Sequence, residues 1–112
     1  MARAATTADV FNAVAEPRRR QILDLLASGE RPVNDLVKLL GVAQPQVSKH
    51  LRVLRAVRLV DVREDGRQRL YRLTAAPLRP VHDWVRAFEQ SWSDRLDLLD
   101  SLLDELQGET RA

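Results

Sequence analysis

Residues 32–57 constrain the fold most, because two helical patterns lie there with only three residues between them. Apolar residues recur every three or four positions over 32–40 and again over 44–57, as they do along the buried face of a helix. The turn between the two patterns begins with Gly41, and glycine commonly ends a helix because it adopts the left-handed conformation without strain. Two helices joined by such a turn predict a helix-turn-helix.

Two further helices are predicted before this pair. The first is expected to begin after Thr7, whose side chain suits the N-cap position, and to end near Ala15. The second is expected to begin at Pro17, because proline fits the first turn of a helix, and to end at Ser28-Gly29. The predicted apolar faces consist of Val10, Phe11 and Val14 in the first helix and of Ile22, Leu23, Leu25 and Leu26 in the second.

A β-hairpin is predicted over residues 59–73. Two short runs with β-like patterns lie on either side of Asp65-Gly66, the dipeptide that favours a two-residue type I′ turn. Tyr71 and Leu73 share one face of the second strand, but Arg69 lies on that face too. Alternation along the strand therefore leaves open which face is buried.

The last third of the chain has the pattern of one long helix over residues 80–107. Its apolar stripe consists of Val81, Trp84, Val85, Phe88, Trp92, Leu96, Leu99, Leu103 and Leu106. Such a helix is about 40 Å long, whereas a domain of this size is only about 30 Å across. Part of the stripe is therefore expected to need a partner.

The sequence contains no cysteine and only two histidines. Disulfides, thiolate metal sites and cysteine nucleophiles are thereby excluded, and no glycine-rich phosphate loop is present. In the last helix only His82, Asp83 and Glu89 are available for a metal site, and the adjacent His82 and Asp83 point about 100° apart. We therefore predict no enzyme, no metal and no cofactor.

No apolar run approaches the roughly 20 residues that are needed to span a bilayer. The N-terminal sequence also lacks the apolar core of a secretory signal. We therefore expect a cytoplasmic protein with no membrane partner.

Charge is distributed unevenly along the chain. Residues 1–79 carry 15 Arg and Lys against 8 Asp and Glu, whereas residues 80–112 carry 3 against 8. A basic segment suits double-stranded DNA, because each neutralised phosphate releases condensed counterions, and an acidic segment is repelled from the same surface. A solvated surface of uneven composition is the alternative explanation, so charge alone does not identify the partner.

The helix over 44–57 has a short, polar and basic outer face. When Val47 and Leu51 are buried, the first turns of this helix can reach base edges in the major groove. The predicted DNA contacts are Gln44, Gln46, Ser48 and Lys49 in these turns, with Arg52 further along and nearer the phosphates. His50 points sideways, so we expect a phosphate contact or a packing hydrogen bond from it rather than base reading. An ordinary surface helix would share this polar face but would not explain the short glycine turn or the hairpin.

The hairpin is expected to act as a wing beside this helix. Guanidinium groups near its tip can contact the DNA backbone or the minor groove. The predicted contacts are Arg63, Arg67 and Arg69. Charged hairpin tips also occur in proteins that bind no DNA, where they prevent edge strands from pairing, so the wing assignment depends on the neighbouring helices.

Three segments together resemble the ArsR-type family of winged-helix repressors. They are Ala15-Glu-Pro-Arg-Arg-Arg-Gln-Ile-Leu, Pro45-Gln-Val-Ser-Lys-His-Leu-Arg-Val-Leu, and Asp65-Gly-Arg with the Tyr-Arg-Leu that follows it. The resemblance covers most of residues 9–106. It implies a homodimer that binds an operator near its own or a neighbouring gene, with an effector, a small molecule or a protein, that governs release. By the same resemblance, the DNA-facing positions carry over as Gln44, Gln46, Ser48 and Lys49.

The chain departs from this family in two respects. Arg58 stands where many relatives have glycine at the end of the reading helix, so the connection to the hairpin is expected to differ slightly. Every position at which relatives carry metal-sensing cysteines holds another residue.

The apolar stripe and the resemblance together predict a dimer that holds two reading helices about 34 Å apart, as paired major grooves require. The predicted dimer interface consists of Phe11, Trp84, Phe88, Trp92, Leu96, Leu99 and Leu103. A small-molecule pocket is the alternative use of the three aromatic residues of the last helix. The outer face of that helix is acidic, and solvation is its simplest role.

Taken together, the patterns predict a mainly α fold, a winged helix-turn-helix of order α-α-α-α-β-β-α with a long C-terminal dimerisation helix. We expect residues 1–112 to form a single domain, with a DNA-binding body over 7–79 that includes the wing over 59–73, and the dimerisation helix over 80–107. The predicted function is that of a dimeric repressor, one that can regulate its own gene, reading an inverted-repeat operator. The alternative is a winged-helix module that binds proteins without specific DNA binding.

Overall fold

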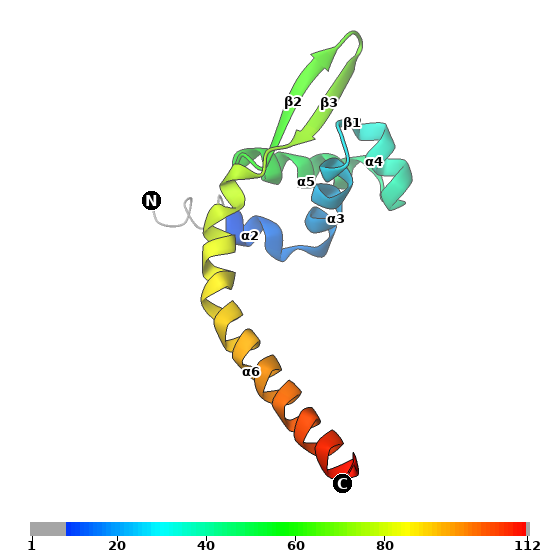
Figure 1. Ribbon diagram of the computed structural model, residues 1–112. Helices are drawn as coiled ribbons and strands as arrows, with labels where there is room; N and C mark the ends of the chain where they lie inside the picture. Colours follow the sequence, from blue (N-terminus) through cyan, green and yellow to red (C-terminus); the bar gives the residue numbers. More distant parts are fainter. Residues whose placement is uncertain (1–8, 112) are drawn as a thin grey trace. The chain divides into compact units, whose positions relative to one another are not determined.

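The structure is a computed structural model that describes residues 9–111 of the chain. The elements in chain order are α2 (Val10–Ala15), α3 (Pro17–Ala27), β1 (Arg31–Pro32), α4 (Val33–Leu40), α5 (Gln44–Ala56), β2 (Val60–Asp65), β3 (Gln68–Leu73), the 3-10 helix η1 (Ala76–Leu78) and α6 (Arg79–Arg111) (Figure 1). The predicted fold class and the predicted order of helices, hairpin and long helix are confirmed. The chain divides between Arg79 and Pro80 into two compact units.

The starts of α2 and α3 are both capped by carboxylates. Asp9 Oδ1 accepts a hydrogen bond of 2.8 Å from the backbone N–H of Phe11, and Glu16 Oε1 accepts one of 3.3 Å from that of Arg18. An N-cap acceptor satisfies a backbone N–H that has no partner within the helix. The predicted N-cap Thr7 lies outside the described residues, and the cap that the structure gives α2 is Asp9.

The core of the first unit lies where α3, α4 and α5 meet the base of the sheet. Its largest fully buried side chains are Ile22, Leu36, Val47, Leu51, Leu54 and Leu59. The predicted inward positions of the reading helix are thereby confirmed. In α2 the residue that is fully buried is Ala13, whereas the predicted apolar residue Phe11 is 38% exposed.

Gly41 ends α4 as predicted. Its φ is +67°, and its N–H donates to the carbonyl oxygen of Val37 at 2.9 Å. Glycine adopts this left-handed conformation without the clash that a Cβ brings. The chain can therefore reverse within three residues and begin α5 at Gln44.

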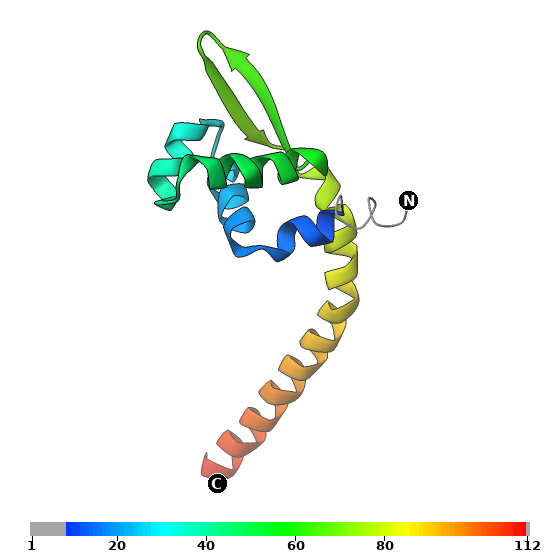
Figure 2. The same cartoon turned by 180° about the vertical axis from the view of Figure 1, so that it is seen from behind.

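The sheet has three antiparallel strands in the order β1-β3-β2. β1 was not predicted, because it consists of two residues, one of them a proline, and so shows no periodicity. Only its pairing with β3, through Arg31 opposite Tyr71 and Pro32 opposite Leu70, makes it a strand. The hairpin of β2 and β3 projects away from the helices of this unit (Figures 1 and 2).

The turn of the hairpin lies one residue later than predicted. Asp65 pairs with Gln68, so the two turn residues are Gly66 and Arg67. A type I′ turn needs a positive φ at both, but only Gly66 has one, at +64°. A glycine at the first turn position is typical of a type II′ turn, so the predicted I′ turn at Asp65-Gly66 was wrong.

The buried face of the wing carries Tyr71 and Leu73, which pack against the core. Val60 and Val62 lie opposite them on β2. Arg69 shares this face, as alternation requires, but it lies beyond the core and is exposed. The position of the core therefore decides a question that the strand pattern left open.

The second unit is a single helix, α6, which continues beyond the predicted end at residue 107. Val81 is half-buried. Ten of the large apolar side chains of α6 are 47–65% exposed, and they are Trp84, Val85, Phe88, Trp92, Leu96, Leu98, Leu99, Leu102, Leu103 and Leu106. The rings of Trp84 and Phe88 meet edge to face, with centroids 5.3 Å apart. Among the described residues, no helix is both long and apolar enough to cross a membrane.

Candidate nucleic-acid interface

The first turns of α5 present the predicted reading residues to solvent. Gln44, Gln46 and Lys49 are exposed, and Ser48 is half-buried beside them. Arg52 follows on the exposed face one turn later. Their positions follow from the burial of Val47 and Leu51, because residues three or four apart share one face of a helix.

A surface groove of about 530 Å³ joins this end of α5 to the wing. It is lined by Pro32, Val33, Asn34, Asp35, Lys38, Gln44, Ser48, Arg67, Gln68, Arg69 and Tyr71. Two of the residues predicted to read bases and two of the predicted wing arginines therefore border one groove. Gln46, Lys49, Arg52 and Arg63 do not line it.

Four polar residues of this groove were not among the predicted contacts, and one of them is the carboxylate Asp35. Asn34 and Lys38 lie four residues apart on the outer face of α4, and Gln68 follows the wing turn. The spacing of Asn34 and Lys38 was a visible signal, because a helix whose Leu36 is buried must turn these two positions outward. For Gln68 the signal lay in the turn, whose position was predicted one residue too early.

The wing arginines lie on two different faces of the hairpin. Arg63 of β2 is opposite Leu70, whereas Arg69 of β3 is opposite Glu64 on the other face. On the first face, Arg63 forms a bidentate ion pair with Glu30. Its Nε lies 2.8 Å from Oε2 and its Nη2 lies 2.9 Å from Oε1. Within residues 9–111, neither Arg67 nor Arg69 has an ion pair.

A second ion pair, between Arg72 and Asp61, lies on the same face as Arg63. Arg72 Nη2 is 2.8 Å from Asp61 Oδ2. The hydrogen bond from Arg72, together with one from the backbone N–H of Val62, lowers the pKa of the Asp61 carboxyl. The hydrogen bond from Arg63 likewise lowers the pKa of Glu30, and that bond raises the pKa of Arg63. The charges of this face are therefore largely neutralised within the protein.

His50 faces back toward α3 rather than out from the reading surface. It is half-buried, and its Nδ1 is buried without a hydrogen-bond partner among the described residues. Partial burial and the nearby cation Arg19 lower the pKa of His50. The predicted packing hydrogen bond is therefore not formed by Nδ1.

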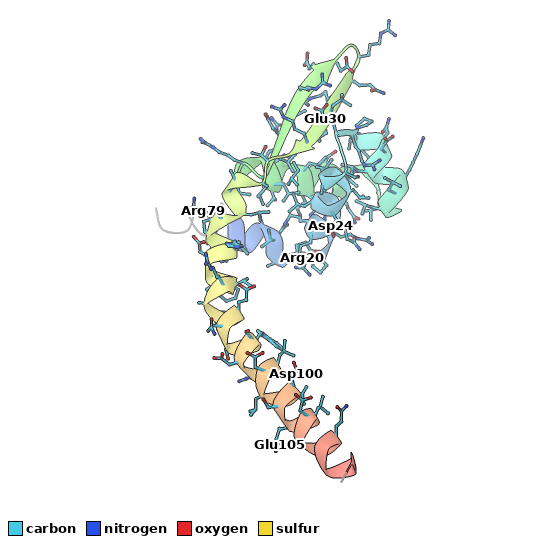
Figure 3. The ribbon with its side chains drawn as sticks, in the orientation of Figure 1. Arg20, Asp24, Glu30, Arg79, Asp100 and Glu105 are labelled. Atoms are coloured by element: carbon cyan, nitrogen blue, oxygen red, sulfur yellow. The ribbon has the colours of Figure 1, made fainter. Side chains whose placement is uncertain are left out.

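Arg19 itself is held by the end of α2. Its Nε donates to the carbonyl oxygen of Ala13, at 2.6 Å, and its Nη2 donates to that of Asn12, at 3.1 Å. Arg20, labelled in Figure 3, donates from Nη1 to the carbonyl oxygen of Val14 at 2.7 Å. Cations suit a helix C-terminus, where the last carbonyl groups lack partners within the helix. These arginines therefore join α2 to α3.

Two surface hollows of about 500 and 250 Å³ beside Trp92 are lined by residues of α6 alone. A hollow on one isolated helix does not enclose a ligand. In the part of the chain that the structure describes, no three His, Asp or Glu side chains are grouped to hold a metal ion.

Comparison with known proteins identifies the family. The family described as bacterial regulatory protein, arsR family, matches residues 16–62. The transcriptional repressor SdpR of Bacillus subtilis is 30% identical over 80 residues, which are 71% of this chain and 89% of SdpR. The HTH-type transcriptional regulator Rv2034 of Mycobacterium tuberculosis is 36% identical over 92 residues, 81% of this chain and 86% of that protein.

A solved structure agrees with these relatives. The ArsR-like transcriptional regulator from Rhodococcus sp. RHA1 is 27% identical, with a TM-score of 0.64 over 91% of this chain and 96% of that one. The matched family segment runs from the cap of α3 through the reading helix and into β2. The chain therefore belongs to the ArsR family of bacterial regulatory proteins.

Proposed function

We propose that this protein is a transcriptional repressor that binds an inverted-repeat operator as a homodimer and reads it with α5. The observation that carries the proposal is the groove that Gln44 and Ser48 of α5 share with Arg67 and Arg69 of the wing. Base-reading and phosphate-binding groups must meet the same stretch of DNA, so they must lie on one surface. Relatives that are named transcriptional repressors and regulators support the same function.

In this proposal α5 and the wing contact different parts of the DNA. Gln44, Gln46, Ser48 and Lys49 contact base edges, because amide, hydroxyl and ammonium groups match the hydrogen-bonding edges in the major groove. Arg52 contacts phosphates further along α5. From the wing, Arg67 and Arg69 contact the adjacent backbone or minor groove, and neither of them forms an ion pair within residues 9–111.

The proposed dimer uses the apolar face of α6. Burying an aromatic or leucine side chain removes it from water at a gain of about 1.5 to 3 kcal/mol each, and this helix exposes ten large apolar side chains. The proposed interface residues are Phe11, Trp84, Phe88, Trp92, Leu96, Leu99 and Leu103. Residues 1–112 then act as a single domain, with the body up to residue 79 on the DNA and α6 at the partner.

The proposal includes no catalytic step, metal or cofactor, and it places the protein in the cytoplasm with the DNA. Because the chain belongs to this family, we also propose that a small-molecule or protein effector releases it from the operator. The outer face of α6, where Asp100 and Glu105 are labelled in Figure 3, is acidic and is therefore expected to stay away from phosphates.

The test is the affinity of the full chain for DNA from upstream of its own gene, measured against scrambled DNA of equal length at one fixed salt concentration. We expect a preference of about 10³-fold or more, the usual lower bound for specific binding. Equal affinity for both DNAs, or no binding, overturns the proposal. A winged-helix protein-interaction module then becomes the better description.

A further inference from the structure

The ion pair between Glu30 and Arg63 crosses the sheet. Glu30 immediately precedes β1, at one edge, whereas Arg63 belongs to β2, at the other. The pair therefore spans β3, and its two contacts of 2.8 and 2.9 Å fix both the distance and the orientation of the side chains. Figure 3 labels Glu30 beside the hairpin.

The wing has few other attachments near its middle. β1 pairs with β3 through Arg31 and Pro32 only, and a proline cannot donate a hydrogen bond to a neighbouring strand. Every residue from Arg63 to Arg69 is exposed, so the outer half of the hairpin has no buried side chain to anchor it. A ribbon that is fixed only at its base can bend, because an isolated two-stranded hairpin is marginally stable.

We propose that Glu30 and Arg63 are positioning residues that hold the wing at the angle at which Arg67 and Arg69 border the groove beside α5. Arg63 then serves DNA binding through Glu30 and not by its own contact with a phosphate. This inference rests on the proposed function. It changes the role that the sequence suggested for Arg63, because the side chain lies on the opposite face from Arg69 and already has a carboxylate partner.

The effect of this pair is expected in DNA binding and not in folding. The side chains of Arg63 and Glu30 are 47% and 31% exposed, and exposed ion pairs contribute little to stability. A small change in wing angle nevertheless moves the tip, where the proposed phosphate contacts lie. Removing the charge of either Glu30 or Arg63 should therefore weaken the same phosphate contacts at the wing tip.

The experiment measures operator affinity and its salt dependence for Glu30→Gln, Arg63→Gln, the double variant and the charge-swapped pair Glu30→Arg with Arg63→Glu. We expect each single variant and the double variant to lose the same affinity, about threefold to tenfold, with a shallower salt slope in each. The charge-swapped pair should recover most of the lost affinity, because it restores an ion pair between positions 30 and 63. Asp61→Asn is the matched control, because its pair with Arg72 lies within the hairpin and does not reach β1.

Two outcomes overturn the inference. In the first, Arg63→Gln weakens binding and lowers the salt slope by about the contribution of one phosphate contact, while Glu30→Gln binds at least as tightly as the unmodified protein. Arg63 then contacts DNA directly. In the second, Asp61→Asn lowers the affinity as much as Glu30→Gln does. The loss of affinity then reflects the change in net charge and not the loss of the ion pair between Glu30 and Arg63. Denaturant midpoints of all variants verify that each is folded, and failure of the unmodified protein to prefer its operator refutes the proposed function instead.

Discussion

The backbone N–H of Arg58 donates a hydrogen bond of 3.0 Å to the carbonyl oxygen of Arg55, at the point where α5 ends. The N–H of Leu59 donates to the carbonyl oxygen of Leu54, also at 3.0 Å, and both leucines are fully buried. This pair of bonds, with an apolar contact across it, is the Schellman motif, whose left-handed position usually holds glycine. Arg58 occupies that position with a φ of +64°. The departure from the family pattern therefore leaves the connection intact but places a side chain where glycine is easier to accommodate.

We predict that Arg58→Gly stabilises the fold. Removing the Cβ relieves left-handed strain of roughly 1–2 kcal/mol, and the larger entropy of glycine in the unfolded chain offsets part of this gain. A net increase of about 0.5 to 1 kcal/mol in the free energy of unfolding is expected. Denaturant titration measures it. The comparison variant is Arg58→Val, whose branched side chain should lower the same free energy, and an unchanged or inverted order of the two variants would contradict this account.

Substitutions in α5 and in the wing should affect DNA binding differently. Ser48→Ala and Lys49→Ala remove groups that read bases, so each should reduce the preference for operator over scrambled DNA. A good bidentate base contact is worth about 1 to 3 kcal/mol. Arg67→Ala removes a phosphate contact and should weaken binding to both DNAs by a similar factor. Paired titrations on the two DNAs measure both effects. Unchanged preference in both α5 variants would mean that another element reads the operator.

A single carboxylate on the apolar face of α6 should separate the dimer. Trp92 and Leu99 are 65% and 51% exposed in the single chain, and a charge buried at an interface is costly without a partner. We expect Trp92→Asp and Leu99→Asp to be monomers by light scattering and to lose operator binding. Ser101→Asp adds the same charge on the opposite side of the helix and should remain dimeric. A dimer that survives both core substitutions would place the interface elsewhere.

His50 should make the fold sensitive to acid. Burial of the imidazole, with Arg19, Lys49 and Arg18 nearby and Glu16 acting in the opposite direction, lowers its pKa below the usual 6.5. Below pH 6.5 the unfolded chain therefore binds more protons than the folded one, so the free energy of unfolding falls as the pH drops from about 6.5 toward the folded-state pKa. The stabilising effect of the neutral ring is fully present above pH 6.5.

The measurement is the free energy of unfolding between pH 7.5 and pH 5.5 for the unmodified protein and for His50→Gln. The variant has no group that titrates at this position, so its curve should be flatter over this interval. Parallel curves for the two proteins would show that other groups cause the acid sensitivity.

The helices and their buried faces were predictable because each has a long apolar repeat and clear end signals. Pro17, Gly41 and the buried residues Val47 and Leu51 illustrate this, since local sterics and a 3.6-residue period determine them. The turn was placed one residue early because Asp-Gly and Gly-Arg both supply a glycine, and only the pairing of Asp65 with Gln68 distinguishes them. β1 was missed because two residues carry no period.

By itself the sequence determined the helix-turn-helix, the existence of the hairpin, the long final helix and the outward position of the reading residues. These follow from short-range sterics and from the periodic burial of apolar side chains, which a chain carries in its own order. Only the tertiary structure decided that Arg63 pairs with Glu30, 33 positions away, while Arg69 borders the groove with Ser48. Contacts between distant residues depend on strand order and register, and no local pattern encodes which of several arginines will face a carboxylate and which will face open solvent.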